Sequence, residues 1–214
     1  MPEKLLRKDS YFGLYSLMAE NQRAHIANAV EGTMRFVEFG MGGTTIWFLQ
    51  NFTEGVQYLS LEHNPAFREL VLDTIASKMP EATRTFTAPE VNTHTLIVRR
   101  LKRCNATAGE ENPEGLDAYI KHPALGFSSP DTLKPTVYLI DGVARSSCIR
   151  HAAEHAADGS LIYIHDHERQ WYQEALCHCR LRLEEVIKAP MGHYPPSMGC
   201  YRVEGKRAWE GVVD

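Results

Sequence analysis

The chain has 214 residues, of which 43% are hydrophobic and 23% charged, a composition expected of one soluble globular domain. Its net charge of -4 offers no general attraction to nucleic acid or to anionic membranes, so we expect neither partner. No run of about 18 apolar residues is present, which argues against a membrane-spanning helix. The charged amino end does not match a secretory signal, and five irregularly spaced cysteines indicate reduced thiols, so we expect a cytoplasmic protein.

The first part of the chain alternates helical and strand patterns. Apolar residues at roughly helical spacing predict a leading helix within an N-terminal helical segment, residues 1–33. Thr44 and Thr45 are suited to cap one later helix, and Asn64 with Pro65 opens another. The expected elements are a helix at 14–30, a strand at 35–39, a helix at 46–52, a strand at 57–62 and a helix at 64–79. This order is typical of a parallel sheet with crossover helices.

The same alternation resumes after a stretch rich in Gly, Pro, Asn, Ser and Thr, which we interpret as a loop-rich insertion at 81–135. Within it we expect a short strand at 84–87 and a short helix at 116–121. The later elements are a strand at 136–141, a helix at 145–157, a strand at 160–165, a helix at 168–180 and closing strands at 183–188 and 200–204. The pattern therefore predicts one doubly wound α/β domain over residues 1–214, with a mainly parallel sheet and an antiparallel closing pair.

The turn from Glu38 to Thr45 connects the first strand to its helix. Glycine permits a sharp turn and the close approach of a ligand, and the helix start offers free N–H groups to a carboxylate. A phosphate-binding loop would need a lysine here, and the dinucleotide fingerprint would need a glycine where the chain has Thr45. A tight turn with no ligand is the alternative interpretation.

Glu62 ends the second strand, 22 residues after Gly40. A carboxylate at this position can accept two hydrogen bonds from the hydroxyls of a ribose. Taken alone, Glu62 is equally well explained as an exposed residue at a strand end. The glycine turn beside it favours the binding role.

The pattern Glu-x-Gly-x-Gly-x-Thr at 38–44 resembles the acidic-x-Gly-x-Gly-x-Gly motif of class I S-adenosylmethionine-dependent methyltransferases, with Thr44 in place of the last glycine. Glu62 and Asp141, each closing a later strand, extend the resemblance, which covers roughly residues 34–204. It implies the fold of that family, in which a seven-stranded, mainly parallel sheet ends in an antiparallel C-terminal hairpin.

The resemblance also implies which residues would hold S-adenosylmethionine. Glu38 and the two glycines after it would contact the methionine end, Glu62 the ribose, and Asp141 with Gly142 the region of the methyl group. Pro89 and Glu90 are the nearest candidates for an adenine contact. The implied cofactor-binding set is Glu38, Gly40, Met41, Gly42, Thr44, Thr45, Glu62, His63, Asp141 and Gly142.

Acidic, basic and imidazole side chains gather after the two later parallel strands. The candidate catalytic residues are Asp141, Arg145, His165 and Asp166. His165 or His167 could take a proton from a hydroxyl or an amine, because an imidazole titrates near neutral pH. Arg145 and Arg169 could hold a carboxylate or phosphate of the substrate. For each of these side chains a purely structural role is the alternative.

Asp141 and Asp166 raise a second hypothesis, since they end strands that we expect to be neighbours. Some members of the family bind a magnesium ion with carboxylates at such positions, and hard divalent cations favour oxygen ligands. A magnesium site is therefore a further candidate.

Together these features predict a methyltransferase that uses S-adenosylmethionine and acts on a small-molecule hydroxyl or amine by in-line transfer. The alternatives are an NAD(P)-dependent oxidoreductase with the same turn and Glu62, or a module that binds S-adenosylmethionine without turnover. The identity of the acceptor and the oligomeric state are left open.

Overall fold

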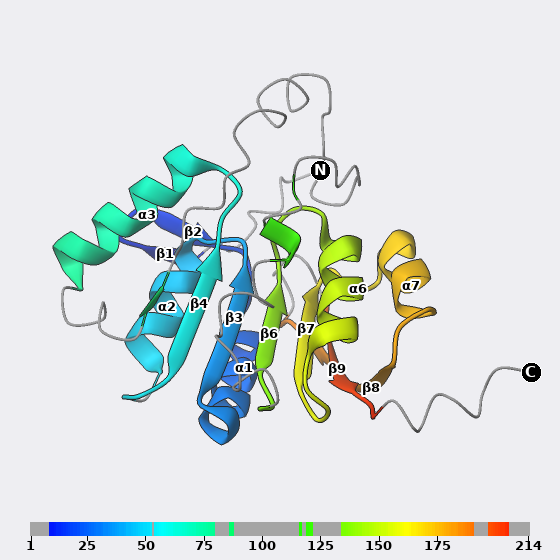
Figure 1. Cartoon of the computed structure of the whole chain (residues 1–214). Helices are drawn as coiled ribbons and strands as arrows, with labels where there is room; N and C mark the ends of the chain where they lie inside the picture. The colour runs from blue at the N-terminus through cyan, green and yellow to red at the C-terminus, as the bar shows by residue number, and fades with distance from the viewer. Residues whose placement is uncertain are drawn as a thin grey trace, which may run out of the picture.

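The computed structural model describes residues 9–52, 54–79, 86–87, 116, 119–121, 134–190 and 197–205. In this part of the chain a central β-sheet lies between two layers of helices (Figure 1), and its strand order is β5-β4-β3-β6-β7-β9-β8. Its strands are β3 (Arg35–Phe39), β4 (Gln57–Leu61), β5 (Phe86–Thr87), β6 (Val137–Ile140), β7 (Leu161–His165), β8 (Leu181–Lys188) and β9 (Ser197–Val203). None of the helices in these ranges has the length and hydropathy that a transmembrane segment requires.

The pairing of the strands confirms the predicted mixed sheet. β3 pairs in parallel with β4 and β6, and β7 continues the parallel part beside β6. β9 then runs antiparallel to both β7 and β8, which gives the predicted closing pair. Among the described residues the sheet has six strands of four residues or more, and it reaches seven only with the two-residue β5. Residues 84 and 85 of the predicted third strand lie outside the described residues.

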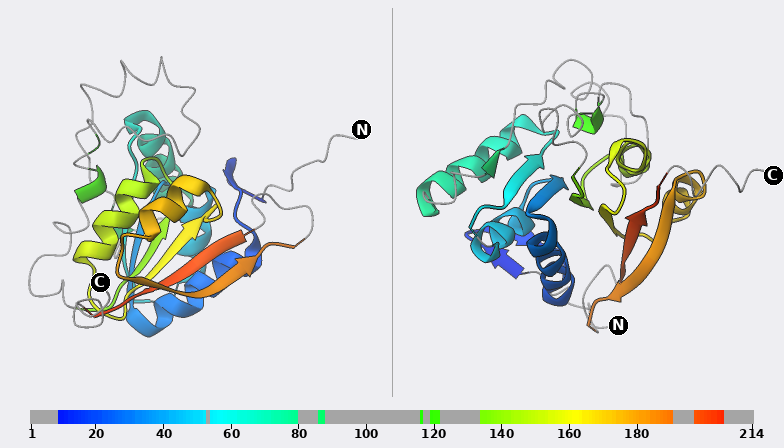
Figure 2. Two further views of the ribbon diagram at one scale, coloured as in Figure 1. Left: turned by 90° about the vertical axis from the view of Figure 1, so that its right-hand side faces the viewer. Right: turned by 60° about the horizontal axis from the view of Figure 1, so that its bottom comes forward.

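Among the described residues, two helices cover each face of the sheet and another lies toward one edge, and residues 119–121 of the short helix predicted at 116–121 are also helical. α1 and α2 lie against one face and α6 and α7 against the other, as the turned views in Figure 2 show. The helices are α1 (Glu20–Thr33), α2 (Gly43–Asn51), α3 (Pro65–Lys78), α6 (Arg145–His155) and α7 (Gln170–Leu176). The Asn64 side chain accepts hydrogen bonds from the N–H groups of Ala66 and Phe67, so the predicted cap of α3 is confirmed. α7 is shorter than the helix predicted at 168–180.

The prediction of a helix from residue 14 is wrong for its first turn and a half. Residues before α1 instead form an antiparallel hairpin of β1 (Asp9–Tyr11) and β2 (Leu14–Ser16). Phe12 and Gly13, with φ of 51° and 87°, make its left-handed turn. Leu14 is buried while Tyr15 is exposed, so part of the spacing taken as helical comes from the alternation of β2. Residues 1–8 of the predicted N-terminal segment lie outside the described residues.

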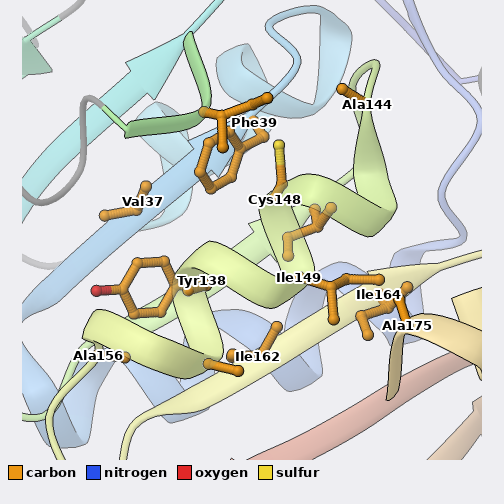
Figure 3. Close-up of a cluster of buried hydrophobic side chains, with 14 of the residues drawn as sticks. Val37, Phe39, Tyr138, Ala144, Cys148, Ile149, Ala156, Ile162, Ile164 and Ala175 are labelled. Carbon is orange, nitrogen blue, oxygen red and sulfur yellow. The ribbon is translucent and has the colours of Figure 1, made fainter. Parts of the chain in front are cut away.

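The core is divided by the sheet because side chains alternate along each strand. Val37 and Phe39 of β3 pack with Ile162, Ile164 and α6 on one face (Figure 3). Phe36 points to the opposite face and packs with α1 and α2. Each such fully buried side chain contributes about 1.5–3 kcal/mol, so the strands form a rigid frame for the loops at their ends.

Candidate functional site

A cavity of about 440 Å³ lies at the carboxyl ends of β3, β4, β6 and β7. This is the edge at which ligands bind in parallel α/β sheets. Most of the predicted site residues meet in its wall: Gly40, Met41, Gly42, Thr44, Glu62, His63, Asp141, Gly142, Arg145, His165 and Asp166. Arg169, considered from the sequence as a substrate clamp, also lines it. The wall further includes residues that the sequence did not single out: Tyr15, Leu17, Asn64, Phe67 and Val143.

Part of the cavity wall is formed by two turns, one at Gly40 and one at Gly142, whose backbones approach closely because neither glycine has a side chain. Gly40 has φ of 100°, and a Cβ there would lie 2.7 Å from the Cα of Gly142. The Gly40 N–H donates to the Leu61 carbonyl at 2.8 Å, and the Asp141 N–H donates to the Phe39 carbonyl at 3.0 Å. These bonds tie the ends of β4, β3 and β6 together. Both glycines are thus required by the close approach of the two chains.

The N-terminal hairpin closes one side of the cavity. A Cβ on Gly43 would lie 2.5 Å from the Tyr15 carbonyl carbon, so β2 rests directly on the first turn of α2. The hydroxyls of Ser16 and Thr44 are 3.0 Å apart and share a hydrogen bond. Tyr15 and Leu17 thereby reach the cavity wall. No pattern in the sequence predicts this contact, because it depends on docking between segments that are distant along the chain.

Glu38 and Thr45 do not line the cavity, which corrects the expectation that they contact a ligand directly. Both are fully buried, and Thr45 Oγ1 donates to Glu38 Oε2 at 2.8 Å while accepting the Gly42 N–H at 2.9 Å. Tyr58 and Ser60 donate to the same carboxylate oxygen at 2.5 and 2.7 Å. Glu38 therefore supports the turn from inside the protein, because β3 directs its side chain toward α2.

The pKa of Glu38 reflects this position. Burial raises it from 4.5 to about 7, although the hydrogen bonds from Tyr58, Ser60 and Thr45 act in the opposite direction. Within the described structure, Oε1 of Glu38 has no hydrogen-bond partner. The carboxyl group therefore titrates near neutral pH, above the usual range of a glutamate.

Glu62 lies in the cavity wall with much of its hydrogen-bonding capacity already in use. Its Oε2 accepts the Met41 N–H at 3.2 Å, and its Oε1 accepts the Asn64 N–H at 2.8 Å. His63 Nδ1 also lies 2.8 Å from Oε1. Since a carboxylate has about four acceptor positions, one remains on Oε2.

Asp141 and His165 form a side-chain pair in the cavity wall, with His165 buried and the Asp141 side chain 21% exposed. His165 Nδ1 lies 2.7 Å from Asp141 Oδ1, and His165 Nε2 has no hydrogen-bond partner within the described structure. Burial raises the pKa of Asp141, but His165 and the Arg145 guanidinium outweigh it and hold the pKa below its usual range. The ionised Asp141 carboxylate beside Nδ1 fixes the orientation of the imidazole ring.

Arg145 has no N–H group left for a substrate. Its Nε donates to the Gly142 carbonyl at 2.9 Å, and Nη1 contacts the His165 carbonyl at 2.9 Å and Asp166 Oδ2 at 3.3 Å. Its Nη2 donates to the Asp141 carbonyl at 3.0 Å and lies 3.1 Å from Asp141 Oδ1. A guanidinium has five N–H donors, and all five are engaged here. Arg145 therefore positions the site and is not the predicted clamp.

Two residues in left-handed conformation flank this network. Ala144 and Asp166 have φ of 49° and 59°, which costs a residue with a Cβ about 1–2 kcal/mol. Asp166 Oδ2 binds both Arg145 and Arg169, the latter at 2.5 Å.

No group of three or more His, Cys, Asp or Glu side chains in the described ranges is arranged to hold a metal ion. The two carboxylates proposed as magnesium ligands instead face guanidinium groups.

Other candidates from the sequence lie elsewhere. His167 is buried outside the cavity wall, with its Nδ1 3.1 Å from the Tyr201 hydroxyl. Burial lowers its pKa. Pro89 and Glu90, considered for an adenine contact, lie outside the described residues.

Comparison with known proteins identifies the fold. No protein-family model and no curated protein matches the chain. Among solved structures, it is similar to a methyltransferase-like protein from Silicibacter pomeroyi, with 17% identity, a TM-score of 0.54 and coverage of 87% of both chains. An O-methyltransferase from Bacillus cereus in complex with SAH gives 12% identity and a TM-score of 0.54, covering 87% of this chain and 82% of that one. A methyltransferase from Geobacter sulfurreducens gives 8% identity and a TM-score of 0.52, and the match covers 87% of this chain and 81% of that one. At these identities the likeness shows a shared methyltransferase fold.

Proposed function

We propose that this chain is an S-adenosylmethionine-dependent methyltransferase that acts on a hydroxyl or amine of a small molecule. The fold supports it, since the Bacillus cereus neighbour of that fold was solved with SAH. The observation that carries the proposal is the Asp141–His165 pair, which lies in the same cavity as the glycine turn and Glu62. A proton acceptor and a nucleoside-binding edge thus share one cavity.

The residues present fit S-adenosylmethionine. Gly40 and Gly42 leave that part of the wall without side chains, and the first turn of α2 has backbone N–H groups suited to the methionine carboxylate. Glu62 has an acceptor position on Oε2 for a ribose hydroxyl. These groups account for the methionine carboxylate and for a ribose hydroxyl of the cofactor.

When bound, S-adenosylmethionine supplies a methyl group on a sulfonium sulfur, which is attacked in line by a nucleophile. The chain then has to orient the acceptor, exclude water and remove one proton. His165 Nε2 is the group that takes the proton, because its other nitrogen is held by Asp141. Arg145 keeps the Asp141 carboxylate ionised and oriented. Asp141 and Arg145 are therefore positioning residues for His165.

The first experiment is calorimetric titration of the protein with S-adenosylhomocysteine, with NADH and NADPH as the competing ligands. The titration gives the dissociation constant of S-adenosylhomocysteine. In urea unfolding, the ligand at about 100 times this constant should raise the free energy of unfolding by about 2.7 kcal/mol. Binding of a dinucleotide in its place would identify the oxidoreductase alternative.

The second experiment measures transfer of radiolabelled methyl groups from S-adenosylmethionine to a panel of small hydroxyl and amine compounds. His165→Gln should lower turnover by about 10²–10⁴-fold with unchanged affinity for S-adenosylhomocysteine. His178→Gln, at an exposed position outside the cavity, is the matched control and should have no effect. Cofactor binding with no transfer to any acceptor would favour the non-catalytic module, and full activity of His165→Gln would remove the assigned base.

A further inference from the structure

Arg169 differs from Arg145 in what its guanidinium contacts. Among the described residues it has one ion pair, from Nη2 to Asp166 Oδ2, and lies 6.0 Å over the ring of Trp171. It lines the cavity and its side chain is 25% exposed. Since a guanidinium carries five N–H donors, several remain for a ligand. Within the described ranges, Arg169 is therefore held from one side and its other N–H donors have no protein acceptor.

The hairpin side of the same cavity is apolar and exposed. Tyr15 is 65% exposed and Leu17 40% exposed, although both are large side chains in a cavity wall. Phe12 on the same hairpin is 51% exposed but does not line the cavity. Burying apolar surface stabilises a complex in proportion to the area covered. Tyr15 and Leu17 are thus suited to an apolar part of a ligand.

We propose that the methyl acceptor is an apolar small molecule with an anionic oxygen group, which binds Arg169 while its apolar part packs against Tyr15 and Leu17. This inference rests on the proposed function, because it names the acceptor class of that site. The anionic group is a carboxylate or a phosphate, either of which forms charge-assisted hydrogen bonds with a guanidinium. The acceptor hydroxyl or amine then has to reach His165 in the same cavity.

The charges around Arg169 are consistent with an added anion. Asp166 is shared between Arg145 and Arg169, and Asp141 is shared between Arg145 and His165. The two carboxylates thus balance the two guanidinium groups, and among the described residues Asp166 is the one carboxylate that contacts Arg169. The competing explanation is that Arg169 binds the carboxylate of the cofactor itself.

The test uses the full chain saturated with S-adenosylhomocysteine and measures the binding of matched pairs of probes by calorimetry. The pairs are 4-hydroxybenzoate with its methyl ester, and phenyl phosphate with phenol, so that each differs mainly in the anionic group. The wild type should bind at least one anion ten times more tightly than its neutral partner. The pair that shows the preference distinguishes a carboxylate site from a phosphate site.

Arg169→Met should abolish that preference, while Arg182→Met, an exposed arginine outside the cavity, should keep it. Tyr15→Ala and Leu17→Ala should weaken the anion and its neutral partner together by roughly fivefold, since they remove apolar contact. Phe12→Ala should change neither.

Three results would overturn the inference: no anion preference in the wild type, a preference that survives Arg169→Met, or an Arg169→Met variant that loses affinity for S-adenosylhomocysteine. The last would assign Arg169 to the cofactor. If S-adenosylhomocysteine fails to bind the wild type, the proposed function fails first, so the two failures are distinguishable.

Discussion

Replacing Glu38 with Gln tests the protonation of the carboxyl group beneath the glycine turn. Burial raises its pKa from 4.5 to about 7. In the unfolded chain the same group ionises near 4.5, so between these values the native state binds more protons than the unfolded state. The free energy of unfolding therefore falls as the pH rises through this interval, and it is highest where the carboxyl is protonated.

The size of the effect follows from the two pKa values. The interval from 4.5 to about 7 corresponds to about 3 kcal/mol of stability lost by pH 8. Glutamine has no charge to bury and keeps a carbonyl oxygen for the hydroxyls of Tyr58, Ser60 and Thr45. Glu38→Gln should therefore lack this loss. The difference between wild type and variant also cancels the other groups that titrate in the same range.

Urea unfolding followed by circular dichroism at pH 5, 6, 7 and 8 measures this difference. The free energy of unfolding of Glu38→Gln, relative to that of the wild type, should increase steadily as the pH rises, by about 2–3 kcal/mol over the series. Glu31→Gln, at an exposed position of α1, is the control and should show no trend. A difference that stays constant, or that shrinks toward pH 8, would refute the reasoning that burial controls this carboxyl group.

Four further substitutions address the helices, the turn and the network. Gly43→Ala should destabilise the protein by about 1–3 kcal/mol in urea unfolding because its Cβ meets the backbone of β2, whereas Gly32→Ala, which meets nothing within 4 Å, should stabilise α1 by about 0.5–1 kcal/mol. Asp141→Asn should lower the free energy of unfolding by about 2 kcal/mol at neutral pH by removing a partner of Arg145; because the pKa of Asp141 is lowered, the difference from wild type should vanish as the pH falls through the native pKa. Glu62→Gln should weaken S-adenosylhomocysteine about tenfold by calorimetry, since hydrogen bonds to a charged acceptor contribute about 1.5–3 kcal/mol, and unchanged affinity would contradict the ribose role.

Much of the cavity was predictable because each of its parts is a short motif at the end of one strand. The ends of parallel strands meet at one edge, so Gly40, Glu62, Asp141 and His165 could be placed together from the strand pattern alone. The direction of Glu38 could also have been found. Glu38 is opposite Ser60 in the sheet register and shares that face with Tyr58, so three polar side chains lie on a buried face between two strands. Such a pattern indicates an internal network.

The hairpin and the role of Arg145 could not be predicted in the same way. The hairpin contact depends on the packing of Gly43 against a segment almost 30 residues earlier in the chain. No local sequence pattern predicts that packing. Arg145 was identified as a residue of the site, but its role depends on backbone carbonyls from two different strand ends. Every residue has a backbone carbonyl, so the residue types cannot predict which carbonyls converge on one guanidinium.

The position of Arg145 also explains why the magnesium hypothesis does not suit these residues. The fold does bring Asp141 and Asp166 to one cavity, but Arg145 lies between them and contacts an oxygen of each. A divalent cation placed there would have to displace a buried guanidinium and leave three backbone carbonyls without their donor, each loss costing about 1–3 kcal/mol. It would also break the ion pair that orients Asp141 toward His165. The positive charge between the two carboxylates is therefore a side chain of the protein, and in the proposed reaction the acceptor is activated by proton transfer to His165.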